Sequence, residues 1–458
     1  MKSKEIFAET ALLPSGWAQN VSVSVDPSGR IAEVRKDAQP GAFTHRVGVL
    51  LAAPANLHSH AFQRAMAGFT ETRGSGASDS FWTWRQVMYR FLEQLTPEDV
   101  EAITGFVQME MLEAGYAASV EFHYLHHRPD GEPYADLAEM SGRVCAAAAD
   151  TGIGLTLLPV LYQYGGIDRR PLGAGQVRFG NDPDRYARLL EGAEAALTGL
   201  PPDARIGVAP HSLRAVDAER LTWASELRPD APLHMHIAEQ VAEVEEIRQA
   251  TGARPVDWLL DTHAVDGRWC LIHCTQMTEA ETVRLATSGA VAGLCPITES
   301  SLGDGIFNGE SYVGQGGRFG IGSDSNIRIS LSEELRTLEY SQRLASSRRA
   351  VFAEAGRSTG RVLFEAALSG GAAAAGRDCG AIEAGRVADL LSLDAEATGL
   401  LGRAGDQILD SWIFAGDDRL VRDVWSAGRH VVREGRHVAR NGIEARYRRT
   451  IRCLTGAI

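Results

Sequence analysis

The sequence predicts an α/β protein with a closed (β/α)8 TIM-like barrel and a small composite β-sandwich domain built from both chain ends. Eight short apolar runs alternate with longer segments of helical periodicity, which is typical of β/α units around a parallel sheet. Polar side chains gather where these runs end, and a barrel carries its chemistry at the carboxyl ends of its strands. Short β-like runs at both chain ends predict the second domain.

The β-sandwich is expected from residues 1–50 and 376–458. The first part contains NVSVSVDPSGRIAEVR, an alternating run interrupted by a turn, which is typical of a hairpin. The last part contains GAIEAGRVADLLSLD and VRDVWSAGRHVVREGRHV, whose short runs are separated by Gly-Arg turns, and then a tail. Residues 51–375 are assigned to the barrel.

The predicted barrel strands end in side chains that can carry chemistry. In chain order the runs are VGVLLAAPANLHSH, ASVEFHY, GLTLLPVLY, RIGVAPHS, PLHMHIAE, RWCLIHC, GAVAGLCP and FGIGSDS. Their ends hold His58, His60, Tyr124, His211, His236, His273 and Asp324. Ordinary core or surface histidines would have no reason to gather at one rim, so we expect these residues to form one site.

Composition narrows the class of partner. The chain has 458 residues, 44% of them hydrophobic, and a formal net charge of −13. An acidic surface argues against nucleic acid or an anionic membrane, so a small-molecule substrate is expected. No run approaches the roughly 18 apolar residues of a membrane span, and the N-terminus lacks the apolar core of a signal peptide. A cytoplasmic location is therefore expected.

Lysine and cysteine usage excludes several mechanisms. Lysine occurs only at positions 2, 4 and 36, so the main body has no candidate for a Schiff base, a pyridoxal anchor or a metal-bridging carbamate. The six cysteines are widely spaced and never form Cys-x-x-Cys, so neither a disulfide framework nor a thiolate metal site is expected.

The first run ends in a His-x-His pair that suits a metal ion. In a strand His58 and His60 point to the same face. Together with one histidine of LHMHIAEQ and with Asp324, they offer three imidazoles and a carboxylate to one divalent metal such as zinc. Such an ion converts bound water into a nucleophile near neutral pH, which predicts hydrolytic chemistry.

The spacing of LHMHIAEQ does not decide which of its two histidines binds the metal. His236 is preferred because it lies nearer the strand end, and His234 is expected to be a packed or supporting residue. Glu239 follows His236 by three residues, where a carboxylate would lie beside the substrate. We expect Glu239 to act as a general acid or base.

Together these motifs resemble the amidohydrolase superfamily. The resemblance covers nearly the whole chain: an N-terminal His-x-His, histidines on strands five and six, and the aspartate of GSDS on strand eight. Binuclear members commonly use a carbamylated lysine on strand four, but the fourth run here ends in VAPHSL without lysine. The resemblance therefore implies a single metal ion, and every expected ligand is present.

Longer strings narrow the resemblance to the formimidoylglutamate deiminase family. They are VEFHYLHH, GVAPHSLRAV, HIAEQ, RPVDWLLD, GAVAGLCPITESSLGDGIF and GIGSDS. That family releases ammonia from N-formimino-L-glutamate in histidine degradation and leaves N-formyl-L-glutamate; related proteins suggest a homodimer. The resemblance implies these site residues: His58, His60, His236 and Asp324 for the metal, and Glu239, His273 and Asp324 for the chemistry.

A substrate with two carboxylates calls for cationic clamps, and arginine is their natural bidentate partner. Arg214 follows the fourth run, and Arg85 lies in residues 74–91, which are expected to form a loop that covers the substrate. Gln63, Tyr124 and His211 are the other expected substrate contacts, although His211 could equally be structural.

Two positions depart from the family pattern, and two other functions compete. Asn326 and Gln276 stand where related sequences often have histidine, which leaves the exact formimino substrate open.

A purine or triazine aminohydrolase on the same barrel is the nearest alternative, and its pocket would favour aromatic stacking and amide contacts over two arginines. A catalytically inactive structural protein would be expected to lack some of the metal ligands.

Overall fold

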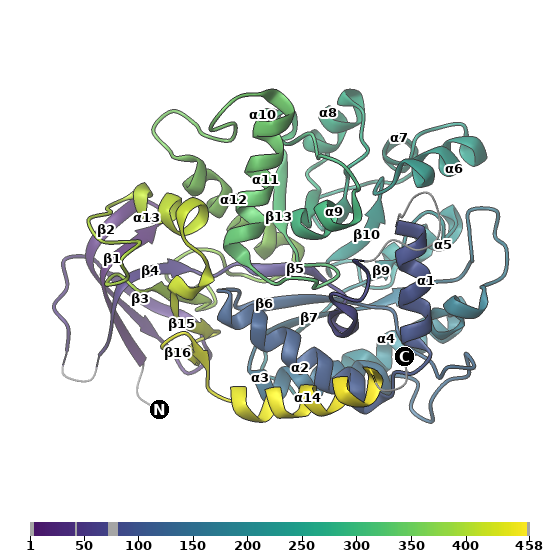
Figure 1. Cartoon of the computed structure of the whole chain (residues 1–458), viewed down its shortest axis with the longest axis horizontal. Coiled ribbons are helices and arrows are strands. Elements are labelled where there is room, and N and C mark those ends of the chain that lie inside the picture. Colours follow the sequence, from purple (N-terminus) through teal and green to yellow (C-terminus); the bar gives the residue numbers. More distant parts are fainter. Residues whose placement is uncertain (1–3, 42–43, 72–80, 456–458) are drawn as a thin grey trace.

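The computed structural model describes residues 4–41, 44–71 and 81–455, with side chains from residue 84 onward in the last range. Two parts are visible in Figure 1: a barrel surrounded by helices, and a sheet whose strands come from both ends of the chain. No helix within the described ranges is long and apolar enough to cross a membrane.

Parallel strands form the barrel predicted from the sequence. Its strands are β5 (Ala55–Ser59), β6 (Ala118–His123), β7 (Gly154–Leu161), β8 (Arg205–Ile206), β9 (Ala209–Pro210), β10 (Leu233–Ile237), β11 (Trp269–His273), β12 (Val291–Leu294) and β13 (Arg318–Ile321). β8 and β9 both pair with β7 and share the place of one interrupted strand. Bridges from Val208 to Leu233 and from Ser59 to Asp324 close the ring.

The barrel strands are buried on both faces, which explains their nearly continuous apolar runs. Every residue of β5, β6, β7, β10, β11 and β12 is buried. Side chains that point inward fill the barrel, and those that point outward pack under the surrounding helices. The polar residues at the strand ends are therefore held on a rigid frame.

Helices alternate with the barrel strands, and many begin at a side-chain cap. They are α2 (Pro97–Glu113), α3 (Glu139–Thr151), α4 (Pro183–Leu197), α5 (Ala218–Glu226), α6 (Val241–Thr251), α7 (Pro255–Thr262), α8 (Glu279–Ser288), α9 (Pro296–Leu302), α10 (Gly309–Gly314), α11 (Leu331–Ser346) and α12 (Thr359–Ala374). Thr96 and Thr278 form capping boxes at α2 and α8, and Ser330 caps α11.

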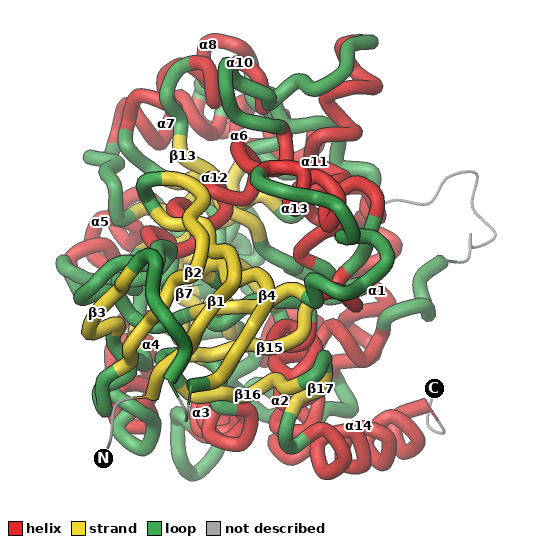
Figure 2. Tube along the Cα trace, turned by 90° about the vertical axis from the view of Figure 1, so that its left-hand side faces the viewer, coloured by secondary structure: helices red, strands yellow, loops and turns green. Residues whose placement is uncertain are grey.

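Strands from the two chain ends form one mixed sheet, as the sequence predicts. Its order is β17-β16-β15-β14-β4-β1-β2-β3. The strands are β1 (Lys4–Leu13), β2 (Gly16–Val25), β3 (Ile31–Arg35), β4 (His45–Ala52), β14 (Leu390–Leu393), β15 (Val421–Ser426), β16 (Arg429–Arg433) and β17 (Arg436–His437). The chain ends meet where β14 pairs with β4, and Figure 2 shows this sheet facing the viewer.

The first apolar run is two strands, so its interpretation as one barrel strand is wrong. Residues up to Ala52 belong to β4 in the mixed sheet, and the barrel begins with β5 at Ala55. The chain changes sheets at Ala53, which donates to the carbonyl of Asp389, and at Pro54, which has no N–H to donate. The apolar pattern continues across the junction because both sheets are buried there.

The prediction that residues 74–91 form a loop over the substrate is also wrong for the part of this segment that the structure describes. Residues 72–80 lie outside the described ranges, but α1 (Phe81–Leu92) is a helix. Met88, Phe91 and Leu92 are buried on one side of it at helical spacing. The Gly/Ser-rich start of the segment concealed this period in the sequence.

The predicted tail contains a helix. α14 (Arg440–Thr455) lies along α2 in Figure 1, and the rings of Phe106 and Tyr447 stack with centroids 3.9 Å apart. This contact anchors the C-terminal segment to the barrel. Shorter elements complete the fold: α13 (Asp406–Asp410), a π-helical turn at Ser411–Ala415, and 3-10 turns at Ala61–Met66, Ala174–Phe179 and Asp418–Leu420.

Candidate active site

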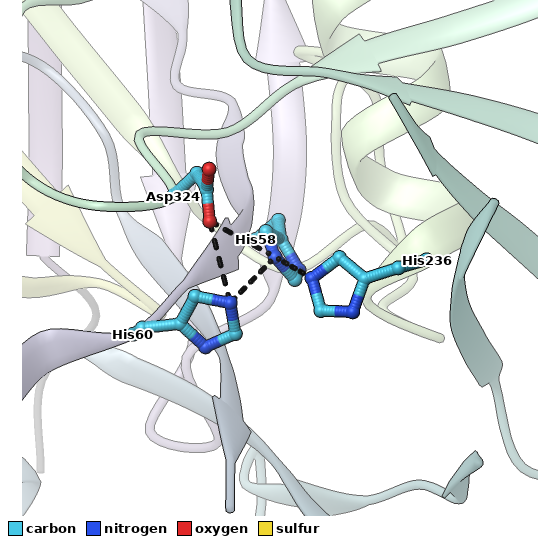
Figure 3. A group of neighbouring side chains, drawn as sticks. All are labelled: His58, His60, His236 and Asp324. Carbon is cyan, nitrogen blue, oxygen red and sulfur yellow. Dashed lines mark hydrogen bonds and ion pairs between the residues drawn. The ribbon is translucent and has the colours of Figure 1, made fainter. Parts of the chain in front are cut away.

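Four side chains from three parts of the barrel converge at its carboxyl end (Figure 3). They are His58 and His60 at the end of β5, His236 on β10, and Asp324 after β13. Nε2 of His58 lies 3.2 Å from Nε2 of His60 and 3.1 Å from Nε2 of His236. Oδ1 of Asp324 lies 3.3 Å from Nε2 of both His58 and His60.

The hydrogen bonds around this cluster fit a bound cation. Nδ1 of His60 lies 2.9 Å from the carbonyl oxygen of Phe122, and Nδ1 of His236 lies 3.1 Å from that of His211. A carbonyl oxygen only accepts, so each Nδ1 carries the proton and each Nε2 presents a lone pair. Burial lowers the pKa of His58 to about 3, which keeps its imidazole neutral. Three ring nitrogens and a carboxylate oxygen this close together suit a positive ion between them.

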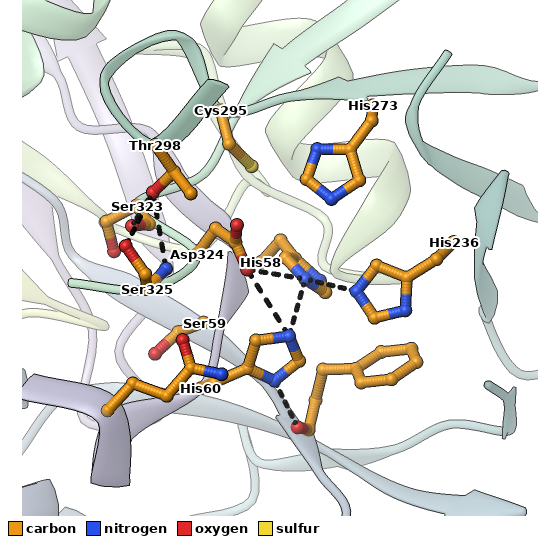
Figure 4. A network of polar contacts seen from close by, with 12 residues as sticks. His58, Ser59, His60, His236, His273, Cys295, Thr298, Ser323, Asp324 and Ser325 are labelled. Carbon is orange, nitrogen blue, oxygen red and sulfur yellow. Dashed lines mark hydrogen bonds and ion pairs between the residues drawn. The ribbon is translucent and has the colours of Figure 1, made fainter. Parts of the chain in front are cut away.

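Backbone strain accompanies three of the strand ends at the site. Ala238, His273 and Asp324 have φ values of 52°, 74° and 44°, in the left-handed region that residues other than glycine rarely adopt. Such strain persists where the surrounding structure enforces it, and functional sites are its usual location. Figure 4 shows His236, His273 and Asp324 directed toward the same region.

His234 is directed away from the cluster. Its Nε2 lies 2.7 Å from the carbonyl oxygen of Ala374 in α12, and its side chain is fully buried. The two histidines of β10 therefore differ in role: His236 faces the cluster, and His234 ties the strand to an outer helix.

A second group, centred on His273, adjoins the metal cluster. Nδ1 of His273 lies 3.3 Å from Oε1 of Glu299, and its Nε2 lies 3.7 Å from Oε1 of Glu239. Burial alone would lower the pKa of His273, but the nearby carboxylates of Glu239, Glu299 and Asp324 outweigh it and raise that pKa well above its usual value. The imidazolium is therefore held between two glutamates.

Glu239 is a buried acid with a pKa near neutrality. Burial raises its pKa to about 7, although the charge of His273 opposes the shift. Its backbone N–H donates to Oε2 of Glu243, 3.0 Å away, which fixes the turn after β10. A general acid or base works best when its pKa lies near the working pH, so Glu239 suits proton transfer.

The cavity that contains these groups also has two arginines in its wall. Arg85 from α1 and Arg214 from the segment after β9 line it together with Gln63, Tyr124 and His211. Nη2 of Arg85 donates to the hydroxyl of Tyr162 at 3.1 Å, and Nε2 of Gln63 donates to that of Tyr124 at 2.8 Å. All the residues expected at the site line this cavity except His58, which is fully buried and joins it through its contacts with His60, His236 and Asp324.

The sequence did not identify several residues that shape this site. Tyr162 and Asp304 are examples: Tyr162 closes the third apolar run, a position that could have identified it. Asp304 comes after α9. One of its carboxylate oxygens lies within 4.8 Å of a carboxylate oxygen of Glu239 and of a ring nitrogen of His273. Burial, followed by the charge of Glu239, raises the pKa of Asp304 to about 9.

Glu121 is another residue that the sequence did not identify. It is a buried carboxylate within β6, and its Oε1 accepts from the N–H of Ala61 at 2.7 Å. This contact supports the turn immediately after His60. Only its position inside an otherwise apolar run could have drawn attention to it.

The two departures from the expected pattern have structural partners. Nδ2 of Asn326 donates to Oγ of Ser59 at 3.1 Å, and its Oδ1 accepts from Oγ of Ser323 at 2.6 Å. Asn326 thereby joins β5 to the end of β13 beside the metal cluster. Gln276 donates to the carbonyl oxygen of Asp304 and so holds the loop that carries this acid.

Comparisons with known proteins agree with this geometry. Residues 49–431 match a model of the amidohydrolase family, and residues 3–46 match a model of the N-terminal domain of formimidoylglutamate deiminase HutF. The formimidoylglutamate deiminase of Pseudomonas aeruginosa is 49% identical over 431 residues, which cover 94% of this chain and 94% of that protein.

Two further relatives extend the comparison. The crystal structure of an amidohydrolase from Brucella melitensis has a TM-score of 0.95 and 48% identity, and covers 99% of this chain and 100% of its own. The 5-methylthioadenosine/S-adenosylhomocysteine deaminase of Natronomonas pharaonis is 28% identical over 410 residues, or 87% of this chain and 85% of that protein.

Proposed function

The chain belongs to the amidohydrolase family, and we propose that it hydrolyses N-formimino-L-glutamate to N-formyl-L-glutamate and ammonia. Its similarity to a formimidoylglutamate deiminase extends over 94% of both chains. The substrate carries one carboxylate on the carbon that bears the amidine nitrogen and a second at the end of its side chain. Its site therefore needs proton-transfer groups at the amidine and cations for both carboxylates.

The cavity wall supports this substrate most directly. Arg85 and Arg214 line the same cavity as Glu239 and the histidine cluster. A guanidinium binds a carboxylate through two parallel hydrogen bonds, which both attract the carboxylate and fix its orientation. Two such groups beside one set of proton-transfer residues match a dicarboxylate whose reacting carbon must reach the cluster.

The metal proposed for the cluster is a single divalent ion, most simply zinc. Three imidazole nitrogens and one carboxylate oxygen suit zinc and leave a position for water. When bound, such an ion lowers the pKa of water by several units and so supplies a nucleophile near neutral pH. His58, His60, His236 and Asp324 would hold it.

The protein's own side chains then move the protons. Asp324 accepts a proton from the attacking water, with the charged His273 nearby to stabilise the carboxylates. Water adds to the formimino carbon, and Glu239 delivers a proton to the terminal nitrogen. The proton held by Asp324 then passes to the same nitrogen, the carbon–nitrogen bond breaks and ammonia leaves. Glu239 takes the remaining hydroxyl proton as the oxygen of water becomes the formyl oxygen. The second nitrogen remains attached to the glutamate.

Aromatic side chains in the same cavity favour one alternative substrate. Trp84, Tyr89, Tyr162 and Phe179 line it and could stack on a purine, and the 28% identical relative is named as a nucleoside deaminase. A purine offers no carboxylate to Arg85 and Arg214, so two cationic groups would face a neutral ring. The arginines therefore favour the dicarboxylate.

The test is ammonia release by the purified protein, with metal content measured on the same sample. N-formimino-L-glutamate, N-formimino-L-aspartate and guanine are compared, together with the variant Arg214→Met. We expect the glutamate derivative to be preferred by about a hundredfold or more in kcat/KM, and the variant to raise KM for dicarboxylates more than for a monocarboxylate analogue. Activity on guanine alone would overturn the proposal.

Assembly and location remain predictions. The sequence resemblance suggests a homodimer, and the composition suggests the cytoplasm. Sedimentation at several protein concentrations would test the first, and fractionation of the source cells would test the second.

A further inference from the structure

A second cluster of metal-type ligands lies in the mixed sheet, on strands that contribute nothing to the catalytic cavity. His45 begins β4, Asp423 lies on β15 and His430 lies on β16. Nε2 of His430 lies 2.8 Å from Oδ1 of Asp423, and Nε2 of His45 lies 3.5 Å from the same oxygen. The ligand atoms of all three side chains lie within 4.8 Å of one another.

The carboxylate of this cluster is fixed before any ligand arrives. Asp423 is only 2% exposed, and its Oδ2 accepts from Oγ of Ser392 at 2.9 Å. The same Ser392 oxygen accepts from the backbone N–H of Asp423 at 3.1 Å. Oδ1 is therefore turned toward the two imidazoles. Nε of Arg422 lies 3.9 Å from Oδ2, on the far oxygen of the carboxylate.

Ring packing holds the two histidines at this position. His430 stacks on Trp425, with centroids 4.5 Å apart and planes 20° apart. His45 meets the same indole edge-on at 5.4 Å and meets His430 at 4.8 Å. Two imidazoles packed on one tryptophan lose little further freedom when they bind an ion. The side chain of His45 is 42% exposed, which gives an ion a path from solvent.

We propose that His45, Asp423 and His430 form a second binding site for a divalent transition-metal ion of the zinc class. Bonds of about 2.0–2.2 Å to a tetrahedral zinc ion place its ligand atoms roughly 3.3–3.6 Å apart. Nε2 of His45 already lies 3.5 Å from Oδ1 of Asp423, whereas Nε2 of His430, which is hydrogen-bonded to that oxygen at 2.8 Å, would move outward as the ion replaces the hydrogen bond. Two histidines and a carboxylate are an established donor set for such ions, and Ser392 supplies the supporting hydrogen bond that orients the carboxylate.

The consequence would be a cross-link between the two chain ends. His45 belongs to the N-terminal part of the sheet, and Asp423 and His430 belong to the C-terminal part. An ion bound only in the folded state stabilises that state by mass action. The site would therefore be structural and independent of the reaction at the barrel.

Zinc stoichiometry of the full-length, untagged protein tests this proposal. We expect equilibrium dialysis against zinc to give two ions per chain, and His45→Ala and His430→Gln to give one. Ser392→Ala should retain the three ligands with zinc affinity weakened by about 10- to 100-fold, because it removes the hydrogen bonds that Ser392 makes with the carboxylate and the backbone N–H of Asp423. His263→Ala is the control, since His263 is a partly exposed histidine near Thr222 outside the cluster.

Catalysis provides the check on folding. Both cluster variants should keep wild-type turnover, because none of the three residues lines the catalytic cavity. One zinc ion per wild-type chain, or two ions retained by both cluster variants, would show that the three side chains are only a hydrogen-bonded charge pair. A stoichiometry that falls in His263→Ala as much as in the cluster variants would also overturn the proposal.

Discussion

Glu239 is the residue whose substitution separates chemistry from binding. Glu239→Gln keeps the shape of the side chain and removes its ability to exchange a proton with the terminal nitrogen of the substrate. We expect kcat to fall by about 10²- to 10⁴-fold, the usual contribution of a general acid or base. Ammonia release measures turnover, and metal analysis checks the cluster.

The matched control is Glu246→Gln. Glu246 lies on α6 outside the cavity, and its Oε1 is 3.8 Å from Nη2 of Arg170. It should retain wild-type turnover. A Glu239→Gln enzyme that retains most of its activity would show that the proton is carried elsewhere.

Asp304 gives a prediction that follows from its protonation state. Burial raises its pKa to about 9, so its carboxyl group is neutral near pH 7 and an amide can replace it. Asp304→Asn should keep kcat within about threefold, and it preserves the acceptor for the side chain of Gln240. Asp304→Ala removes that acceptor and should lower kcat about tenfold or more.

Steady-state kinetics on both Asp304 variants provides the measurement. If Asp304→Asn is as damaging as Asp304→Ala, the carboxylate must be charged during the reaction, contrary to this account.

The sequence was informative for residues that follow a strand, and less so for residues in loops. His58, His60, His236 and Asp324 could be found because the barrel brings strand ends together. Asp304 could not, because it comes ten residues after the end of β12 and its position depends on α9 and on contacts with Gln240 and Gln276. A single sequence does not encode such loop geometry in any local pattern.

At the scale of elements, α12 packs unusually close to the barrel. A methyl group on Gly370 would overlap the carbonyl oxygen of Phe319 in β13, and one on Gly371 would lie 2.8 Å from the carbonyl oxygen of Ala55 in β5. We expect Gly370→Ala to lower the free energy of unfolding by about 3 kcal/mol or more, since the helix must move away from the backbone of β13.

Gly142 in α3 is the control, because a methyl group there would have no neighbour within 4 Å. Gly142→Ala should raise the free energy of unfolding by about 0.5–1 kcal/mol through helix propensity alone. Urea unfolding of both variants measures the difference. Equal effects at the two positions would contradict the close packing of α12.

Elements could be predicted where one periodicity applied throughout. The seven later apolar runs each mark a barrel strand position, but the first run crosses from β4 into β5 because both sheets bury it. α1 was mistaken for a loop because glycine and serine dominate the start of its segment. These errors arise where tertiary burial, which a local pattern does not reveal, determines the element.

At the scale of the whole molecule, a buried ion network joins the barrel to the mixed sheet. Nη2 of Arg377 donates to Asp203 at 2.7 Å, and Nε donates to Asp389 at 2.6 Å. Arg429 on β16 also donates to Asp203 at 2.7 Å. Burial would raise the pKa of Asp203, but the two arginines outweigh it and lower that pKa to about 2.

The lowered pKa of Asp203 predicts a pH-dependent stability. The carboxylate stabilises the fold above its unfolded pKa of about 4, and this contribution disappears as the pH falls through about 2. Asp203→Asn should therefore be destabilised near pH 7, by about 3–5 kcal/mol for a broken buried pair, and the gap to wild type should narrow by about 2–3 kcal/mol toward pH 2.

Urea midpoints measured across that pH range test this linkage, with Asp266→Asn as an exposed control. A gap that stays constant with pH would mean that Asp203 has an ordinary pKa in the folded protein.

We propose that one cavity uses water to replace the terminal nitrogen of a formimino dicarboxylate. Turnover of N-formimino-L-glutamate in oxygen-18 water tests it most directly. We expect one ammonia to be released for each N-formyl-L-glutamate formed, with a single oxygen-18 in the formyl group. Absence of turnover by the metal-loaded protein, or a product without the solvent oxygen, would contradict it.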